Sequence, residues 1–511
     1  KRESLIFLDY LTSALPYHLL RPERVLVLGM GGGSGLLQAA YHGVNTIEAV
    51  ELNPDLVSLF QQTLAGFSGW PLLQDRVRIH IEEGRGFLTD SNQRYDQIQL
   101  SLLDSASASS AGVLALSENY LYTTEGMLTM LGRLDMGGLL AVTRWVKLPP
   151  RDGLKLFATA IEALRSSGVE NPAERLLMIR GWKTSTLLIK NGRFRADEIA
   201  RAKDFCRDRS FDLAYYPGIE PGETNRFNQL PEPYYYQGAK ALLGGAAADY
   251  LADYKFDISP ASDDRPYFFN FFKWSALKEI QSLYRQGGMS LLELGYPVLV
   301  ATLGQAVLVS ILLIVLPLRF VSGGRRRNDT YRWRVALYFF CIGLAFLFIE
   351  IAFMQKFTLF LSHPLHAAAV VLSGFLLFAG LGSRYAGSVK QRVGAHAIAK
   401  ILLLLGVVLL SYLALLPELF SVMAGFPGPL RILLSLLLIM PVAFSMGMPF
   451  PLALQRVSAQ APALVPWAWA INGCASTISA VAAVLLAIHF GISSLILLAL
   501  ALYFIAGMMK L

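Results

Sequence analysis

Residues 25–35 read Val-Leu-Val-Leu-Gly-Met-Gly-Gly-Gly-Ser-Gly, an apolar run that ends in a glycine-rich turn. Such a run predicts a buried parallel strand over 25–29, and the apolar residues that follow predict a helix over 36–42. Further strands are expected at 46–51, 77–81, 97–103 and 138–143, with a second helix capped by Asn53. Strands that alternate with helices at this spacing predict an α/β domain with a doubly wound parallel sheet.

The glycine-rich turn is typical of a nucleotide site. Glycines let the backbone approach a ligand closely, and the N-terminus of the next helix offers unpaired N–H groups and a positive dipole. An acid about 20 residues further on can accept hydrogen bonds from both ribose hydroxyls, and Glu51 holds that position. Glu83 follows the third strand, where a carboxylate can accept from an adenine amino group. The predicted nucleotide-binding residues are Gly29, Gly31, Gly33, Ser34, Gly35, Glu51 and Glu83.

The second half of the chain differs from the first in composition. Hydrophobic residues make up 54% of the 511 and charged residues 16%, against about 25% charged residues in soluble domains. The deficit lies after residue 290, in seven apolar runs that each approach the ~20 residues needed to cross a membrane as a helix. These runs cover 296–318, 335–355, 365–383, 399–416, 430–450, 467–488 and 492–509. The sequence therefore predicts an all-α, multi-pass transmembrane bundle of about seven helices.

We divide the chain into a nucleotide-binding domain (1–150), the helical and irregular remainder of the soluble part (151–290) and the transmembrane domain (291–511). The chain opens at Lys1 inside an amphipathic segment, which suggests that an N-terminal part is missing. The net charge is +8, and many of the arginines that contribute to it lie in short loops between apolar runs. They indicate membrane orientation rather than nucleic-acid binding. The cysteines show no metal-ligand spacing, so no metal is predicted.

Positive charges concentrate in one set of loops. Six arginines lie within 319–334, further Arg and Lys residues lie within 384–400, and the opposite loops hold few. The positive-inside bias places the charged loops in the cytoplasm. A single crossing at 296–318 would then put the α/β domain outside, although the nucleotides that such a domain would bind are cytoplasmic. Either the first run does not cross simply, or missing helices set the topology, or the domain uses no such nucleotide, so the side stays open.

Several motifs resemble the spermidine synthase (polyamine aminopropyltransferase) family over residues 5–150. They are Val25–Gly35, Glu51, Glu-Gly-Arg-Gly-Phe at 83–87, Tyr95-Asp96 before a strand, Tyr17-His18 and Leu-Tyr-Thr-Thr-Glu at 121–125. Segments 350–356, 447–451 and 467–473 are similar to membrane-bound spermidine-synthase-like proteins of bacteria. The resemblance implies S-adenosylmethionine or its decarboxylated form as donor, an amine or polyamine as acceptor, and a bacterial inner membrane. It also implies a substrate site at Tyr17 and His18.

Three acids of the family's pattern are absent. Aminopropyl transfer needs a base to deprotonate the attacking amine, and carboxylates to hold a cationic polyamine. The resemblance puts the family's catalytic Asp at position 101, which is Ser101 here, and Asp104 follows about 10 Å along an extended chain. Ser34 and Leu19 replace the other two acids. Asp104, as the base, and Ser101 and Tyr122 are the candidate catalytic residues.

Polar side chains also lie in the apolar runs, where they are costly and tend to line interior cavities. Glu350 and Gln355 lie in the second run, His363 precedes the third, and Asn472 lies in the sixth. The prolines at 441, 449 and 451 are expected to break the fifth run. The sequence predicts a small-molecule site between helices from these four side chains, with helix packing as the alternative.

Two functions remain. The first is a membrane-embedded, transferase-like protein that binds an S-adenosyl nucleotide and transfers an aminopropyl or methyl group to an unknown acceptor. Its partners would be the lipid bilayer and the acceptor, not nucleic acid, with a homodimer left open. The second is a non-catalytic sensing or scaffold domain fused to a membrane transporter or channel, in which the glycines only permit tight packing. Whether the protein is an enzyme is therefore undecided.

Overall fold

The computed structural model describes residues 3–70, 73–102, 113–276, 295–317 and 329–509. The chain forms two compact units, Lys1–Tyr296 (unit 1) and Pro297–Leu511 (unit 2). The predicted boundary at residue 290 lies outside the described residues.

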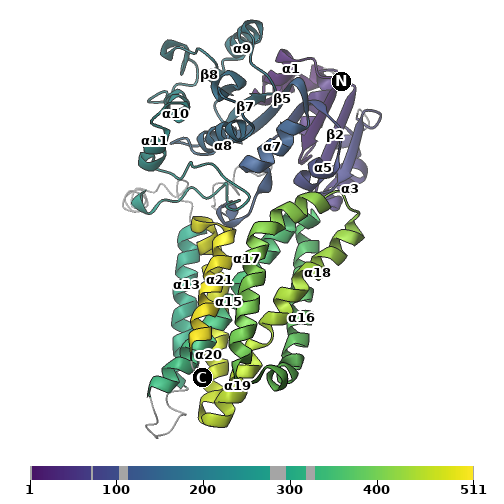
Figure 1. The fold of residues 1–511 in the computed structure, drawn as a ribbon. Helices are drawn as coiled ribbons and strands as arrows, with labels where there is room; N and C mark the ends of the chain where they lie inside the picture. Colours follow the sequence, from purple (N-terminus) through teal and green to yellow (C-terminus); the bar gives the residue numbers. More distant parts are fainter. Residues whose placement is uncertain (1–2, 71–72, 103–112, 277–294, 318–328, 510–511) are drawn as a thin grey trace. The chain divides into compact units, whose positions relative to one another are not determined.

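One mixed sheet of eight strands organises unit 1 (Figure 1), in the order β3-β2-β1-β4-β5-β7-β6-β8. The strands are β1 (Arg24–Leu28), β2 (Thr46–Glu51), β3 (Val77–Ile81), β4 (Tyr95–Leu100), β5 (Leu134–Trp145), β6 (Leu176–Arg180), β7 (Thr184–Lys190) and β8 (Asp212–Tyr215). The first five pair in parallel, as the sequence predicts. The other three add antiparallel pairs. Because β5 pairs with β7, the sheet is continuous across the predicted division at residue 150.

Helices cover both faces of this sheet. They are α1 (Leu15–Leu19), α2 (Ser34–Tyr41), α3 (Pro54–Ser58), α4 (Ala65–Ser68), α5 (Gly84–Asp90), α7 (Thr124–Gly132), α8 (Asp152–Ser166), α9 (Ala196–Arg209), α10 (Tyr234–Leu243) and α11 (Ala247–Asp253). The Asn53 side chain caps α3 as predicted, accepting from the Asp55 amide at 2.9 Å.

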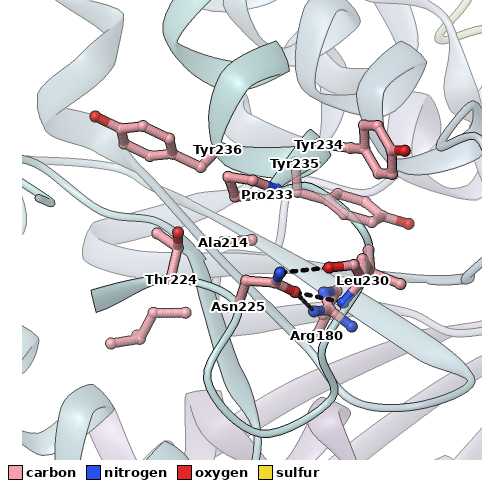
Figure 2. A pocket seen from close by; sticks show the side chains of 10 residues that line it. Arg180, Ala214, Thr224, Asn225, Leu230, Pro233, Tyr234, Tyr235 and Tyr236 are labelled. Atoms are coloured by element: carbon pink, nitrogen blue, oxygen red, sulfur yellow. Dashed lines mark hydrogen bonds between the residues drawn. The ribbon is translucent and has the colours of Figure 1, made fainter. Parts of the chain in front are cut away.

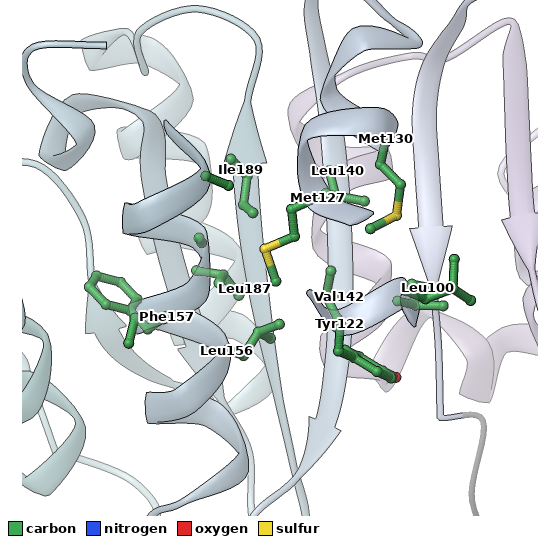
Figure 3. Close-up of a cluster of buried hydrophobic side chains, with 14 of the residues drawn as sticks. Leu100, Tyr122, Met127, Met130, Leu140, Val142, Leu156, Phe157, Leu187 and Ile189 are labelled. Atoms are coloured by element: carbon green, nitrogen blue, oxygen red, sulfur yellow. The ribbon is translucent and has the colours of Figure 1, made fainter. Parts of the chain in front are cut away.

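The core of unit 1 follows from the alternation of apolar side chains along the strands. One face of the sheet packs Leu140, Val142 and Leu187 against Met127 of α7 and Phe157 of α8 (Figure 3). The residues of opposite parity face α1, α2 and α9 in two further clusters. Both faces are therefore buried, which fits a doubly wound arrangement.

Unit 2 consists of helices in the part that the structure describes. They are α13 (Gly295–Ser310), α15 (Asp329–Leu361), α16 (Pro364–Val393), α17 (Ala397–Met423), α18 (Gly428–Met446), α19 (Pro449–Gln460), α20 (Val465–Phe490) and α21 (Ile492–Met508). Among the described residues, six helical segments are long and apolar enough to cross a membrane, with α18 and α19 counted as one. The seventh run forms the shorter α21.

The fifth apolar run differs in one detail from its prediction. Pro441 lies inside α18, which continues through it to Met446. The break falls at Gly447 and Met448, and Pro449 begins α19. At the first position of a helix a backbone N–H has no partner within the helix, so a proline there loses no hydrogen bond. The interruption lies within the predicted run, but Pro441 and Pro451 both lie inside helices and only Pro449 adjoins the break.

Candidate functional site

The glycine-rich turn joins β1 to α2 at the edge where the parallel strands end. Gly29, Gly31 and Gly33 have positive φ angles of 76°, 51° and 81°, a backbone conformation that other residues rarely adopt. A methyl group on Gly33 would also lie 2.1 Å from a ring carbon of Phe60. The turn therefore requires glycine at position 33 for both conformation and space.

Glu51, at the end of β2, is hydrogen-bonded to this turn. Its carboxylate accepts from the Gly31 amide at 3.2 Å and from the Asn53 amide at 3.1 Å. A carboxylate offers about four acceptor positions, so these two bonds leave capacity for ligand hydroxyls. The structure thus brings together the glycine turn and the acid that the sequence predicted to act with it.

Glu83 caps the N-terminus of α5, one strand further along the same edge. Its carboxylate accepts from the Gly86 amide at 2.8 Å. Burial raises the pKa of Glu83 above its ordinary value, and the charge of Asp263 adds to this, while hydrogen bonds from the Arg85 and Gly86 amides oppose it. Glu83 is therefore a half-buried capping residue rather than a solvated loop residue.

Ser101 follows β4 and belongs to a hydrogen-bonded chain under the glycine turn. Its Oγ accepts from Gln99 Nε2 at 3.1 Å, and Gln99 Oε1 accepts from the Tyr17 hydroxyl at 2.6 Å. Gln99 Nε2 also donates to Gln38 of α2 at 3.2 Å. Tyr17 is only 5% exposed. Tyr17, which was predicted to bind substrate, therefore supports the end of β4 from inside the unit. The sequence signal for this role is Gln99, a glutamine between two apolar residues of a strand.

Of the other two predicted catalytic residues, the structure describes only Tyr122. Asp104 lies outside the described residues. The Tyr122 side chain is 0% exposed, stacks on Phe268 with ring centroids 4.8 Å apart, and accepts from Arg144 Nη1 at 3.2 Å. Tyr122 is therefore packed and closed off from solvent, and its catalytic role stays a prediction.

His18, the second predicted substrate residue, lies in a cluster around Asp9. The His18 and His42 Nε2 atoms lie 2.6 Å and 3.4 Å from Asp9 Oδ1, and Arg209 forms an ion pair with Oδ2. The three possible ligand atoms of Asp9, His18 and His42 lie within 4.8 Å of one another. Because the guanidinium already neutralises the carboxylate, we interpret the cluster as a link that ties α1, α2 and α9 together.

This cluster predicts a pH dependence. Burial alone would raise the pKa of the Asp9 carboxyl, but hydrogen bonds from His18 and Arg209 and their charges lower it below its ordinary value. A carboxyl with a lowered pKa stabilises the fold above its ordinary pKa of about 3.9, and this stabilisation is lost as the pH falls through the folded value. We expect the protection of the α9 amides, that is the intrinsic exchange rate at a given pH divided by the observed rate, to fall at acid pH.

The variant Asp9→Asn should lower the protection of α9 by about 10- to 100-fold at neutral pH, since it loses charge-assisted bonds worth about 1.5–3 kcal/mol, and it should show no further loss at acid pH. The matched control is Asp204→Asn on the exposed side of α9, whose partner Arg207 is also exposed. Equal exchange in the two variants would contradict the structural role of Asp9.

A charged segment that the sequence analysis did not assign lies beside Glu83 and α5. Asp263 Oδ2 pairs with Arg85 Nη2 at 3.0 Å, and its Oδ1 accepts from the Thr123 hydroxyl at 2.6 Å. The Asp263 amide donates to Glu125 at 2.9 Å. These bonds hold the 261–265 segment against the N-termini of α5 and α7.

Further acids lie close to Asp263. Burial, together with the charges of Glu118, Asp263 and Asp264, raises the pKa of Tyr120 well above its ordinary value. The fold therefore collects carboxylates near the strand ends, although the acids of the family's pattern are replaced. The adjacent acids at 263 and 264 were the sequence signal, but only the fold shows that they lie near α5.

The four predicted polar residues of unit 2 do not form one site. Glu350 and Gln355 are buried on α15. His363 lies at the junction before α16, beyond the end of α15, and its ring is tilted against that of His366 with centroids 4.5 Å apart. Asn472 packs against Gly343, seven residues before Glu350. The structure therefore separates the group into distinct places.

A small pocket lies elsewhere in unit 1, between the antiparallel strands and α10 (Figure 2). Arg180 of β6, Leu230 and Tyr235 are among the residues that line it. Arg180 donates to Asn225 Oδ1 at 2.8 Å and lies 3.2 Å from Asp212. Since Arg180 is engaged by the protein itself, we interpret this pocket as part of the loop anchorage and not as the nucleotide site.

Comparison with known proteins identifies the first part of unit 1. Residues 11–130 match the family model of the spermine/spermidine synthase domain. A polyamine aminopropyltransferase of Sulfolobus acidocaldarius is 29% identical over 119 residues, which are 23% of this chain and 39% of that protein. One of Korarchaeum cryptofilum is 28% identical over 86 residues, 17% of this chain and 27% of that protein. The chain thus spans well under half the length of these curated relatives.

Solved structures with a similar fold include a spermidine synthase in complex with the transition-state analogue AdoDATO. It has 16% identity and a TM-score of 0.31, and the match covers 46% of this chain and 74% of that one. The human methyltransferase-like protein 13 in complex with SAH has 18% identity and a TM-score of 0.28, with coverage of 41% and 90%.

The motif match and the family match fall on the same residues, those that form β1 to β4, the glycine-rich turn and Glu51. Residues 11–130 therefore match the spermine/spermidine synthase domain, and in this chain they lie within a longer α/β sheet that is followed by an apolar all-helical unit.

Proposed function

We propose that unit 1 binds an S-adenosyl nucleotide where β1 to β4 end and transfers its aminopropyl or methyl group to an amine. The observation that carries the proposal is the hydrogen bond between Glu51 and the Gly31 amide. This bond holds an acceptor for ribose hydroxyls against a turn whose backbone lets a nucleoside or a phosphate-sized group approach closely. Unit 2, with its six long apolar segments among the described residues, would hold the enzyme in a membrane.

The aminopropyl reaction places defined demands on this site. The acceptor nitrogen attacks the aminopropyl carbon attached to the sulfonium, the carbon–sulfur bond breaks, and its electron pair stays on sulfur as methylthioadenosine. The attacking nitrogen must then release a proton to a base. Asp104 remains the candidate base, and Ser101 would contribute only a hydroxyl. A methyl transfer makes a weaker demand, since orientation of the acceptor supplies much of the rate.

The acids near Asp263 support an amine as the acceptor. Glu118, Asp263 and Asp264 act together on Tyr120, and Arg85 pairs with Asp263. A cationic acceptor would be attracted to such a surface beside the nucleotide site. The position of these carboxylates next to Glu83 and α5 makes them substitutes for the three acids that the sequence lacks.

The variant Glu51→Ala is expected to weaken nucleotide binding by about 10- to 100-fold, because it removes charge-assisted hydrogen bonds worth about 1.5–3 kcal/mol. The measurement is calorimetric titration of the detergent-purified full chain with S-adenosylmethionine, its decarboxylated form and methylthioadenosine.

The matched control is Glu162→Ala, an exposed carboxylate on α8, which should leave the affinities unchanged. Preference for the decarboxylated nucleotide would support aminopropyl transfer, and preference for S-adenosylmethionine would support methyl transfer. If none of the three binds to the unmodified protein, the proposal is wrong.

The second candidate is a non-catalytic domain that serves a membrane transporter or channel. The observation in its favour is that Ser101 occupies the family's catalytic position and is held there by Gln99. Under this hypothesis Glu51→Ala would leave the activity of the protein intact, since the glycine turn would only pack against Phe60. A binding response in the titration described above decides between the two.

A further inference from the structure

Unit 2 contains very few acidic residues. After residue 296 the sequence has three, Asp329, Glu350 and Glu418. Asp329 begins α15, and Glu418 is exposed on α17. Glu350 lies two thirds of the way along α15, in a segment that is 61% buried, more than in any other candidate span among the described residues. One carboxyl group is therefore enclosed inside an apolar helical unit.

The Glu350 side chain has no partner among the described residues. It is 8% exposed, so more than nine tenths of it is covered by the unit itself. No described residue donates a hydrogen bond to its carboxyl group or forms an ion pair with it. The nearest basic residue along α15, Lys356, is six positions away and donates to Ser493 of α21 at 3.1 Å. A bare carboxylate so enclosed would cost several kcal/mol, so it must hold a proton or a bound cation.

Aromatic rings share the helix face of Glu350. Phe346 and Phe353 lie four residues before and three after it, which places them on the same side of α15. Phe375 of α16 contacts both, with ring centroids 6.1 Å and 5.6 Å away, and Tyr412 of α17 lies 6.2 Å from Phe353. A carboxylate that shares one helix face with aromatic rings combines the two kinds of group that recognise an organic ammonium ion.

We propose that Glu350 and the adjoining rings form a binding site for an organic ammonium ion inside unit 2. When the site is empty the carboxyl group holds a proton. When the ammonium binds, that proton is released to water and the carboxylate pairs with the cation, so charge is conserved within the apolar unit. The site is independent of the nucleotide site proposed for unit 1.

The test is labelling of the full chain with dicyclohexylcarbodiimide, which forms an N-acylurea with protonated carboxyl groups in apolar surroundings. Peptide mass spectrometry is expected to find the adduct on Glu350 at near-neutral pH and not on the exposed Glu418. Butylammonium should protect Glu350, reducing the labelling rate to about a tenth when its concentration is ten times its Kd. The same concentration of sodium chloride should give no protection.

Three controls keep the outcome specific. Glu350→Gln, which preserves the shape of the side chain, should abolish the adduct, whereas Glu418→Gln should not change it. Glu51→Ala should leave labelling and protection unaltered, so that a failure of the nucleotide site is distinguishable. Absence of the adduct on Glu350, absence of protection, or equal protection by sodium chloride would each overturn the proposal.

A second measurement does not depend on the reagent. In weakly buffered solution, butylammonium binding to the unmodified protein is expected to release close to one proton per chain, and Glu350→Gln should release none. Binding without proton release in the unmodified protein would contradict the exchange.

Discussion

Asp152→Ala is expected to destabilise unit 1 by about 3–5 kcal/mol, because it leaves a buried arginine without its carboxylate. Arg144 and Asp152 side chains are both 0% exposed and lie 3.1 Å apart, and Lys147 approaches the second carboxylate oxygen at 3.5 Å. Arg144 also lies over the Phe269 ring at 4.7 Å. Amide hydrogen exchange of β5 in the full chain should therefore accelerate by about 100- to 3,000-fold.

Two comparisons make this prediction specific. Asp197→Ala removes an exposed pair with Arg195 and should cost less than about 1 kcal/mol. The double variant Arg144→Met with Asp152→Leu replaces the pair by apolar side chains and should recover most of the loss. If the double variant is as unstable as Asp152→Ala, then the loss comes from packing and not from the unpaired charge.

Gly382→Ala is expected to force α16 and α18 apart. A methyl group on Gly382 would lie 2.0 Å from the carbonyl oxygen of Phe444, and one on Gly447 would lie 2.0 Å from that of Ala379. Ordinary contacts between such atoms need more than about 3 Å, so one helix backbone must move. We expect the folded state to lose about 1–3 kcal/mol or more of stability. The measurement is the temperature at which the detergent-purified chain ceases to elute as a single species, which should be lower in the variant.

Gly380→Ala is the matched control for this helix. Nothing lies within 4 Å of a methyl group at that position, and alanine favours a helix over glycine by about 0.5–1 kcal/mol. The control should therefore be slightly more stable than the unmodified chain, whereas Gly382→Ala should be less stable. Equal effects of the two changes would contradict the close backbone contact.

Local patterns were sufficient to predict the first five strands and the course of the apolar helices. The run 25–29, the glycine turn and Glu51 lie in register because each strand is apolar on both sides and each turn is short. The three antiparallel strands were not predicted, although Gly181 in the short turn between β6 and β7 is a hairpin signal. Their order depends on long-range contacts that a single sequence does not display.

The site was predicted only in part, for a physical reason. Gly31 and Glu51 are 20 residues apart in one βαβ unit, so their contact follows from the local fold. Asp263 reaches Arg85 across 178 residues, and Arg144 pairs with Asp152 in a buried position that the sequence analysis did not assign. Tyr17 was assigned to substrate, but the buried Gln99 holds its hydroxyl. Burial, which the sequence does not give, decided each of these cases.

The central claim is that unit 1 uses an S-adenosyl nucleotide as a group donor. Its most direct test is to incubate the purified full chain with a primary diamine and either decarboxylated S-adenosylmethionine or S-adenosylmethionine, and to measure the nucleotide product by mass spectrometry. We predict release of methylthioadenosine from the first or S-adenosylhomocysteine from the second, lost in Glu51→Ala and kept in Glu162→Ala. Formation of neither product, together with no binding of either donor, would contradict the claim.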